Sequence, residues 1–355
     1  MHVKPNNVIK STIKYCLLLV WTVLTTGCIK EDMSDCFSSI RLRFSYTLHD
    51  EPTQGNLFGR DVRHIRAYVF DADGVLNTVA SERGSLLSND YVMNLDLDPG
   101  TYTIVAWGSG GEDFFRSYRQ SQGSATVTDP VPGQTTLDQL RIALACEQTP
   151  DADGNLHPAQ AQFDDLFYGA AGTRSTDGKS LYTIIPVELS PGRSEERTVE
   201  LIRNTNIIRL TVEGVWNFDP ATGIDAWITG TDTRYTSKNT IESTSPRVRF
   251  LPRRGLADAT TIHTDISIQR LEWNRTASEP LSLYVKDLVN DKVLAKLDLV
   301  GLLQKAQDGS GNPLYRNQED FDREYIYPVT LSFAEDLSLR IYVKDWLIQD
   351  IKPEL

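Results

Sequence analysis

The stretch Leu97-Asp-Pro-Gly-Thr-Tyr-Thr-Ile-Val-Ala-Trp107 starts with a pair of turn-forming residues and continues as an apolar run. Alternate side chains of a strand point to opposite faces. One face of this strand therefore carries Tyr102, Ile104 and Ala106, and the other carries Val105 and Trp107. Because both faces are apolar, the sequence predicts an inner strand of a β-sandwich.

The residues around this strand predict two hairpins. Pro99-Gly100 suits the central positions of a type II turn, so residues 91–97 and 101–107 are expected to pair. Residues 65–70 are followed by Asp71-Ala-Asp-Gly74, in which the glycine can adopt a positive φ without steric cost. A return strand is therefore expected from Val75.

The same strand pattern extends over most of the chain. Apolar residues occupy every second position in 40–48 and again in 325–333 and 337–347. No segment shows a helical apolar stripe longer than a turn or two, although 299–305 fits one short helix. Many short strands separated by Gly, Pro and Asn predict an all-β fold of sandwiches. The breaker-rich stretch 190–196 is the best candidate boundary between two domains.

The N-terminus has the order of a secretory signal. Three lysines precede the apolar run 16–24, which is too short to span a membrane, and Gly27-Cys28 follows it. A cysteine directly after a small residue at the cleavage point predicts a bacterial lipoprotein signal, with acyl chains on Cys28. Thr25 stands where the usual motif has leucine. The alternative is ordinary signal cleavage, which would leave Cys28 free or in a disulfide.

The cysteine count gives a second expectation. Of the four cysteines, Cys16 leaves with the signal and Cys28 carries lipid, so Cys36 and Cys146 remain. In an oxidising compartment these two are expected to form a disulfide. The alternative is two separate thiols.

The charge excludes one class of partner. The chain has 36 basic and 48 acidic residues and a formal net charge of −12. Such an acidic chain is not expected to bind nucleic acid, and any attachment to a membrane would depend on the acyl chains.

No catalytic or cofactor-binding motif stands out, so the chain is predicted to be no enzyme and to hold no cofactor. The five histidines are scattered, which speaks against a metal site. The two DxDG stretches at 71–74 and 151–154 share part of a calcium loop, but they are interpreted as tight turns. Trp216, Trp227 and Trp273 would form a sugar-binding row only if they were exposed together.

Several stretches resemble the FimB-type fimbrial anchor lipoproteins, the fimbrillin-associated anchor family of Bacteroides-type bacteria. They are Cys28-Ile-Lys-Glu-Asp-Met-Ser-Asp-Cys36, Arg41-Leu-Arg-Phe-Ser-Tyr46, Val69-Phe-Asp-Ala-Asp-Gly74, Leu97 to Trp107, Asp165-Leu-Phe-Tyr-Gly169 and Leu201-Ile-Arg-Asn-Thr-Asn-Ile-Ile-Arg-Leu210. The acidic residues after Cys28 resemble the export tag of surface-exposed lipoproteins. The second half of the chain matches only in length and β pattern.

The resemblance implies two tandem transthyretin-like β-sandwich domains of Greek-key type after a cleaved lipoprotein signal peptide. The expected division is a signal peptide at 1–27, a lipidated tether at 28–36, and domains at 37–195 and 196–355. It also implies an outer-membrane protein, lipid-anchored and surface-exposed, that holds a fimbria at its base and limits its length.

The implied partner is a major or minor fimbrillin shaft subunit, contacted by strand exchange. We expect this contact in the C-terminal half, with 337–355 as the candidate strand, unless that segment completes its own sheet. A surface glycan-binding lipoprotein and an accessory or tip fimbrial subunit are the alternative functions, and a secreted β-sandwich hydrolase ranks below them.

Overall fold

The computed structural model describes residues 38–351, except 52, 112–113, 121–126, 175–181, 215–222, 232, 243–244, 254–255, 258–259, 276–278 and 337. Cys28 and Cys36 therefore lie outside the described residues, as does Trp216. Within the described part the chain is built from strands, and its three α-helices are short: α2 (Phe58–Asp61), α3 (Leu299–Gln304) and α4 (Gln318–Arg323). None of these helices is long and apolar enough to cross a bilayer.

The strand at 100–109 lies inside the largest sheet of the first half, as the sequence predicts. This sheet has the order β14-β9-β5-β2-β3, and β12 also pairs with β5. Its strands are β2 (His64–Phe70), β3 (Leu76–Arg83), β5 (Gly100–Ser109), β9 (Leu166–Ala170), β12 (Val187–Leu189) and β14 (Ile202–Arg203).

Two smaller sheets cover the two faces of this sheet. One has the order β13-β1-β4, from β1 (Ser38–Ser45), β4 (Val92–Leu97) and β13 (Ser194–Glu200). The other has the order β17-β8-β6-β7, from β6 (Phe115–Gln120), β7 (Val127–Thr128), β8 (Leu140–Leu144) and β17 (Arg234–Thr236), and a 3₁₀ turn η2 (Leu137–Gln139) precedes β8. A separate hairpin joins β10 (Gly172–Arg174) to β11 (Tyr182–Ile184).

The two faces of β5 enter two different cores. Tyr102, Ile104 and Ala106 pack with β1 and β4, whereas Val105 and Trp107 pack with β8 and β17. The predicted division of this strand into two apolar faces is therefore confirmed. The arrangement is three layers of sheet rather than the two layers of a simple sandwich.

The hairpin predicted at Pro99-Gly100 is wrong. β4 pairs antiparallel with β1, whereas β5 pairs with β2, β9 and β12. The chain therefore crosses at this turn from one sheet to the sheet that faces it. A type II turn sequence specifies that the chain changes direction, but it does not specify which strands pair. In the observed arrangement, with the two strands in facing sheets, the apolar faces of both are buried. The hairpin predicted between β2 and β3 is confirmed, with Gly74 at φ 72°.

The second half buries one core between two sheets. The larger has the order β19-β20-β15-β23-β24-β25 and contains β15 (Thr205–Glu213), β19 (Leu256–Ala257), β20 (Thr261–Gln269), β23 (Ile326–Phe333), β24 (Leu339–Val343) and β25 (Trp346–Ile351). The smaller has the order β18-β16-β21-β22 and contains β16 (Ile224–Gly230), β18 (Val248–Phe250), β21 (Ser282–Asp287) and β22 (Lys292–Asp298). The predicted inward positions Val329, Leu331 and Ile341 are fully buried.

The stretch 190–196 forms a turn and the start of β13, which pairs in parallel with β1. Apart from the separate β10–β11 hairpin, the strands before β15 belong to the first three layers, and most strands from β15 onward belong to the second pair of sheets. β17 is the exception, because it pairs with β8 of the first half.

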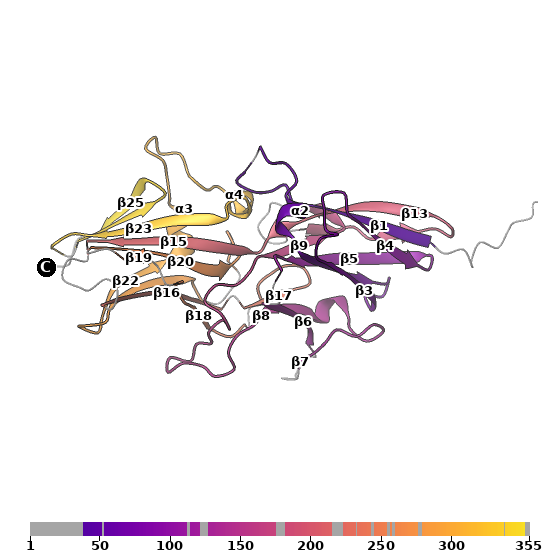
Figure 1. The fold of residues 1–355 in the computed structure, drawn as a ribbon, viewed down its shortest axis with the longest axis horizontal. Helices are drawn as coiled ribbons and strands as arrows, with labels where there is room; N and C mark the ends of the chain where they lie inside the picture. Colours follow the sequence, from indigo (N-terminus) through magenta and orange to yellow (C-terminus); the bar gives the residue numbers. More distant parts are fainter. Residues whose placement is uncertain are drawn as a thin grey trace, which may run out of the picture.

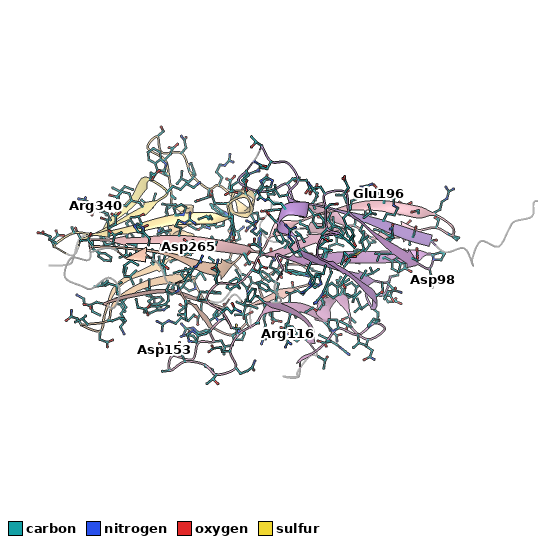
Figure 2. The ribbon with its side chains drawn as sticks, viewed as in Figure 1. Asp98, Arg116, Asp153, Glu196, Asp265 and Arg340 are labelled. Atoms are coloured by element: carbon teal, nitrogen blue, oxygen red, sulfur yellow. The ribbon has the colours of Figure 1, made fainter. Side chains whose placement is uncertain are left out.

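Figure 1 shows an elongated molecule in which the start of β1 and the end of β25 lie at opposite ends of the long axis. In Figure 2, Asp98 and Glu196 mark the end where β1 begins, and Arg340 marks the end near β25. The described chain therefore enters at one end and finishes at the other.

Candidate functional site

Of the cysteines singled out by the sequence, Cys146 alone lies in the described residues. It follows β8, is half-buried, and forms no disulfide with any described residue. Burial raises the pKa of this thiol to about 11, and the nearby Arg234 opposes part of the rise. Lipidation of Cys28 and the pairing of Cys36 with Cys146 stay predictions.

Both DxDG stretches use their first carboxylate to hold a turn. Asp71 Oδ1 accepts the backbone N–H groups of Asp73 and Val75, at 3.0 and 2.9 Å. Asp151 Oδ1 does the same for Asp153 and Asn155. In the part of the chain that the structure describes, no three His, Cys, Asp or Glu residues are grouped closely enough to share a metal ion. The tight-turn interpretation accounts for both stretches.

The two described tryptophans of the proposed sugar-binding row do not present open faces. Trp227 is 9 % exposed; its ring stacks on Tyr284 at 5.1 Å and is covered by the guanidinium of Arg249 at 3.9 Å. Trp273 is partly buried and packs edge-on against Phe321. Both rings serve packing, so they do not form the exposed row that a glycan-binding surface would need.

The segment 337–355 is not one free strand. Its described part forms β24 and β25, and β24 lies between β23 and β25 in its own sheet. The alternative considered from the sequence, that this segment completes its own sheet, therefore holds for residues 339–351.

β25 is left as an edge strand. Among the described strands it pairs only with β24, so its other side presents backbone N–H and C=O groups that a further strand could pair with. Two of its apolar side chains are unusually open, with Trp346 41 % and Leu347 52 % exposed. Sequence reasoning missed this edge because alternation of residues shows a strand but not its position in a sheet. We take the outer side of β25 as the candidate interface.

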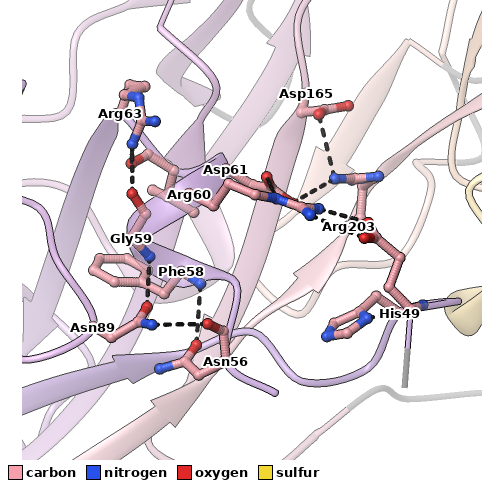
Figure 3. A network of polar contacts seen from close by, with 12 residues as sticks. His49, Asn56, Phe58, Gly59, Arg60, Asp61, Arg63, Asn89, Asp165 and Arg203 are labelled. Atoms are coloured by element: carbon pink, nitrogen blue, oxygen red, sulfur yellow. Dashed lines mark hydrogen bonds and ion pairs between the residues drawn. The ribbon is translucent and has the colours of Figure 1, made fainter. Parts of the chain in front are cut away.

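A buried ionic cluster fixes the two halves to each other. Arg203 ends β14, and its Nη2 lies 3.0 Å from Asp61 Oδ2 and 3.5 Å from Asp165 Oδ2. Figure 3 shows Arg203 directed between these two aspartates, with Arg60 on the far side of Asp61. Its guanidinium carbon also lies 3.8 Å from the ring centroid of Tyr325, at the foot of β23.

This cluster has the electrostatic features of a structural contact. Burial raises the pKa of the Asp165 carboxyl, and the positive charge of Arg203 opposes that rise. Thr205 donates its hydroxyl to Asp165 at 2.9 Å. A charge held in this way is stabilising only while its partners stay in place, so the cluster favours one relative position of the two halves.

A second set of buried polar contacts begins at Asn204, the residue after Arg203. Tyr235 donates its hydroxyl to the carbonyl of Asn204 at 3.2 Å, and Arg270 donates its backbone N–H to the same hydroxyl at 3.0 Å. The side chain of Arg270 then forms a two-pronged pair with Asp322, at 2.6 and 3.1 Å, in which both side chains are 4 % exposed. Asn204 and Asn239 exchange side-chain amide hydrogen bonds in the same set. These contacts thus join Tyr235 of β17, which pairs with β8 of the first half, to the interior of the second half.

Comparison with known proteins fits this architecture. The family model for fimbrillin-A associated anchor proteins Mfa1 and Mfa2 matches residues 33–352. No curated protein matches the chain.

Solved structures share the fold at low sequence identity. The chain is similar to a DUF1812 protein of Bacteroides thetaiotaomicron (TM-score 0.69, 22 % identity, 90 % of this chain and 99 % of that one). It is also similar to a protein of Bacteroides ovatus (TM-score 0.66, 20 % identity, 88 % and 94 % covered). The fimbrial anchor protein Mfa2 of Porphyromonas gingivalis matches with a TM-score of 0.63 and 16 % identity, over 89 % of this chain and 100 % of that one.

The family model covers nearly the whole described chain, and the resemblance inferred from the sequence points to the same group. The chain belongs to the Mfa2 family of fimbrillin-A associated anchor proteins.

Proposed function

We propose that this protein is an outer-membrane lipoprotein that holds a surface fimbria at its base. The match of residues 33–352 to the anchor family is the observation that carries this proposal. In it, acyl chains on Cys28 attach the protein to the membrane, the body lies outside the cell, and the partner is a fimbrillin shaft subunit. Members of this family are fimbrial anchors rather than enzymes, and we propose no catalytic activity.

The arrangement of the two ends supports an anchor. β1 begins at one end of the molecule, and its first residue, Ser38, follows Cys28 by ten positions in the sequence. β25 lies at the opposite end, where its open edge could pair with a strand of the first shaft subunit. We propose that this contact holds the shaft and that its occupation at the base limits the length of the fibre.

The domain division is part of the same proposal. We propose two tandem units of transthyretin type, the first with a third layer of sheet and the second built on β15. The boundary expected at residue 195 stays a prediction, and the pairing of β13 with β1 supports a division after Arg203. The contact of Arg203 with the ring of Tyr325 and the hydrogen bond from Thr205 to Asp165 would keep the two units in one fixed arrangement.

Membrane attachment is tested by Cys28→Ala. We expect this variant, expressed in cells that lack the wild-type protein, to leave the outer-membrane fraction and to release fimbriae into the medium. The measurement is immunoblotting of membrane and medium fractions for both proteins. Retention of the variant and its fimbriae on the cell would contradict the proposal.

The β25 contact is tested separately by Leu347→Glu. Leu347 is 52 % exposed, so the substitution should leave the fold intact while placing a charge on the proposed interface. We expect the variant protein to stay in the membrane while fimbriae detach. Leu86→Glu is the matched control, since Leu86 is 66 % exposed and lies in the first half. Equal attachment with both variants would rule out the β25 contact.

A further inference from the structure

A cleft of about 930 Å³ lies on the first half of the molecule, away from β25. It opens between the β2–β3 hairpin and strand β6, and the end of β8 and the start of β17 close its far side. Neither the ionic cluster of Arg203 nor the open edge of β25 contributes to it. The proposed anchoring function leaves this cleft without a role.

The cleft runs along the edge of β6. Phe115, Arg116, Ser117 and Tyr118 all line it. Successive side chains of a strand point to opposite faces, so a cavity that touches all four lies beside the strand rather than over one face. Among the described residues, β7 pairs with β6 only at Arg119 and Gln120. Within the part of the chain that the structure describes, the segment 115–118 is therefore an open strand edge that faces a cavity.

The lining of the cleft is basic although the chain is acidic. Arg66, Arg116 and Arg234 line it, and Asp129 is its one acidic residue. Arg234 also lies 3.7 Å from Glu242, whereas the side chain of Arg116 is exposed. In a chain of net charge −12, this concentration of positive charge favours an anionic occupant.

Two of these arginines share one face of the sheet. Arg116 pairs with Ala143, and Ala143 pairs with Arg234 on its other side, so the three residues form one row across β6, β8 and β17. Tyr118 lies on the same face; it is 5 % exposed, and its hydroxyl has no hydrogen-bond partner among the described residues. A buried hydroxyl without a partner is costly, and an acceptor entering the cleft would satisfy it.

We propose that the open edge of β6 binds an extended acidic peptide segment of a partner protein, by adding a strand to the sheet. The backbone of the segment would pair with residues 115–118. Carboxylates on alternate positions would lie on the face of Arg116, the arginine on the strand next to the added one, and the intervening side chains would face Phe115 on the opposite side. Arg234, two strands further into the sheet, would add only to the positive charge of the cleft. Strand addition takes affinity from the backbone and specificity from alternate side chains, which this edge provides. This site is separate from the fibre contact proposed at β25.

The test uses a fluorescein-labelled decapeptide of alternating Glu and Val and the purified full chain in detergent, with binding followed by fluorescence anisotropy. We expect saturable binding that weakens as salt is raised. Arg116→Glu should weaken it at least tenfold. Arg193→Glu is the matched control, because Arg193 is an exposed arginine outside the cleft, and it should leave binding unchanged. A Lys–Val decapeptide should not bind.

Two further probes separate strand addition from simple charge attraction. The same Glu–Val peptide with N-methyl groups at alternate residues keeps its charge but loses backbone donors, and it should not bind. Equal binding of the methylated peptide would overturn the proposal. Trigalacturonic acid tests whether the occupant is an acidic glycan. The proposal would also be overturned if this sugar bound, if Arg116→Glu weakened its binding, and if the peptide did not bind. Circular dichroism spectra of all the variants, including Arg116→Gln, establish that the fold is intact. This test does not depend on fimbrial attachment, so either proposal can fail alone.

Discussion

Arg203 and Asp61 are 142 positions apart in the chain, yet Arg203 Nη2 lies 3.0 Å from Asp61 Oδ2, with side chains only 9 % and 12 % exposed. Asp61 ends the short helix α2 in the first half, and Arg203 ends β14, two positions before the first strand of the second half. The pair therefore joins helix α2 to the point where the chain passes into the second half. Asp165 completes the group as a second, buried carboxylate.

Arg203→Met should destabilise the protein strongly. The substitution keeps most of the side-chain volume but leaves Asp61 and Asp165 without their shared cation, and breaking a buried pair in this way costs about 3–5 kcal/mol. The measurement is the free energy of unfolding from urea titration. Arg209→Met is the matched control: Arg209 contacts Asp265 with two nitrogens but is 52 % exposed, and such a pair contributes at most about 1 kcal/mol. Equal losses in both variants would contradict the structural role of Arg203.

Gly169→Ala should also destabilise the fold, because β9 passes close to the end of β13. A Cβ on Gly169 would lie 2.6 Å from the carbonyl oxygen of Glu200 and 2.6 Å from Val199 Cγ1. Overpacking of this kind costs about 1–3 kcal/mol. Gly133→Ala is the comparison, since its added Cβ meets nothing within 4 Å and its cost comes from φ 74° alone. The midpoint of thermal unfolding should fall by several degrees for Gly169→Ala. An unchanged midpoint would contradict the close packing of β9.

In the reduced, folded protein, Cys146 should alkylate slowly at neutral pH. Its thiol has a pKa of about 11, and the thiolate is the reactive form. The rate of reaction with iodoacetamide should therefore rise about tenfold for each pH unit between 8 and 10. In urea the rate should level off near pH 9, because an exposed thiol has a pKa of about 8.5. Mass spectrometry of the untreated protein tests the predicted disulfide, since a bond to Cys36 would leave no thiol to alkylate.

The same thiol links stability to alkaline pH. Its pKa is raised by folding, so the folded state binds more proton than the unfolded state between the two pKa values. The stabilising contribution is complete below about pH 8.5 and is lost as the pH rises toward 11. Cys146→Ala should therefore show a shallower fall in unfolding free energy than the wild type over this range. Parallel curves for the two proteins would show that the thiol is exposed in solution.

Patterns within single strands were predictable from the sequence. The two apolar faces of β5 and the inward positions of β23 and β24 follow from alternation, which the pleat of a strand imposes on any sequence that is buried on one or both sides. The β2–β3 hairpin follows from Gly74, because few other residues adopt its positive φ. The family resemblance drawn from the first half is likewise confirmed.

Contacts between distant segments were not predictable in this way. β4 and β5 flank a good turn sequence and still enter different sheets, whose apolar faces meet in one core. β6 and β16 were missed, since Gly, Ser and Gln around the first and weak alternation around the second hide strands whose partners lie elsewhere. No sequence pattern near Arg203 indicates its role. Its partners are Asp61 and Asp165, and only the fold brings these residues together.

The parallel pairing of β1 with β13 has a mechanical consequence. β1 begins at one tip of the molecule, is hydrogen-bonded on both sides by β13 and β4, and runs along the long axis. If the membrane pulls on the chain ahead of Ser38 while a fibre pulls on the opposite tip, the tension acts along β1. Its hydrogen bonds would then be loaded together in shear instead of opening one after another like a zipper. A domain that begins with such a strand resists the pulling force that flowing liquid exerts on an attached fibre.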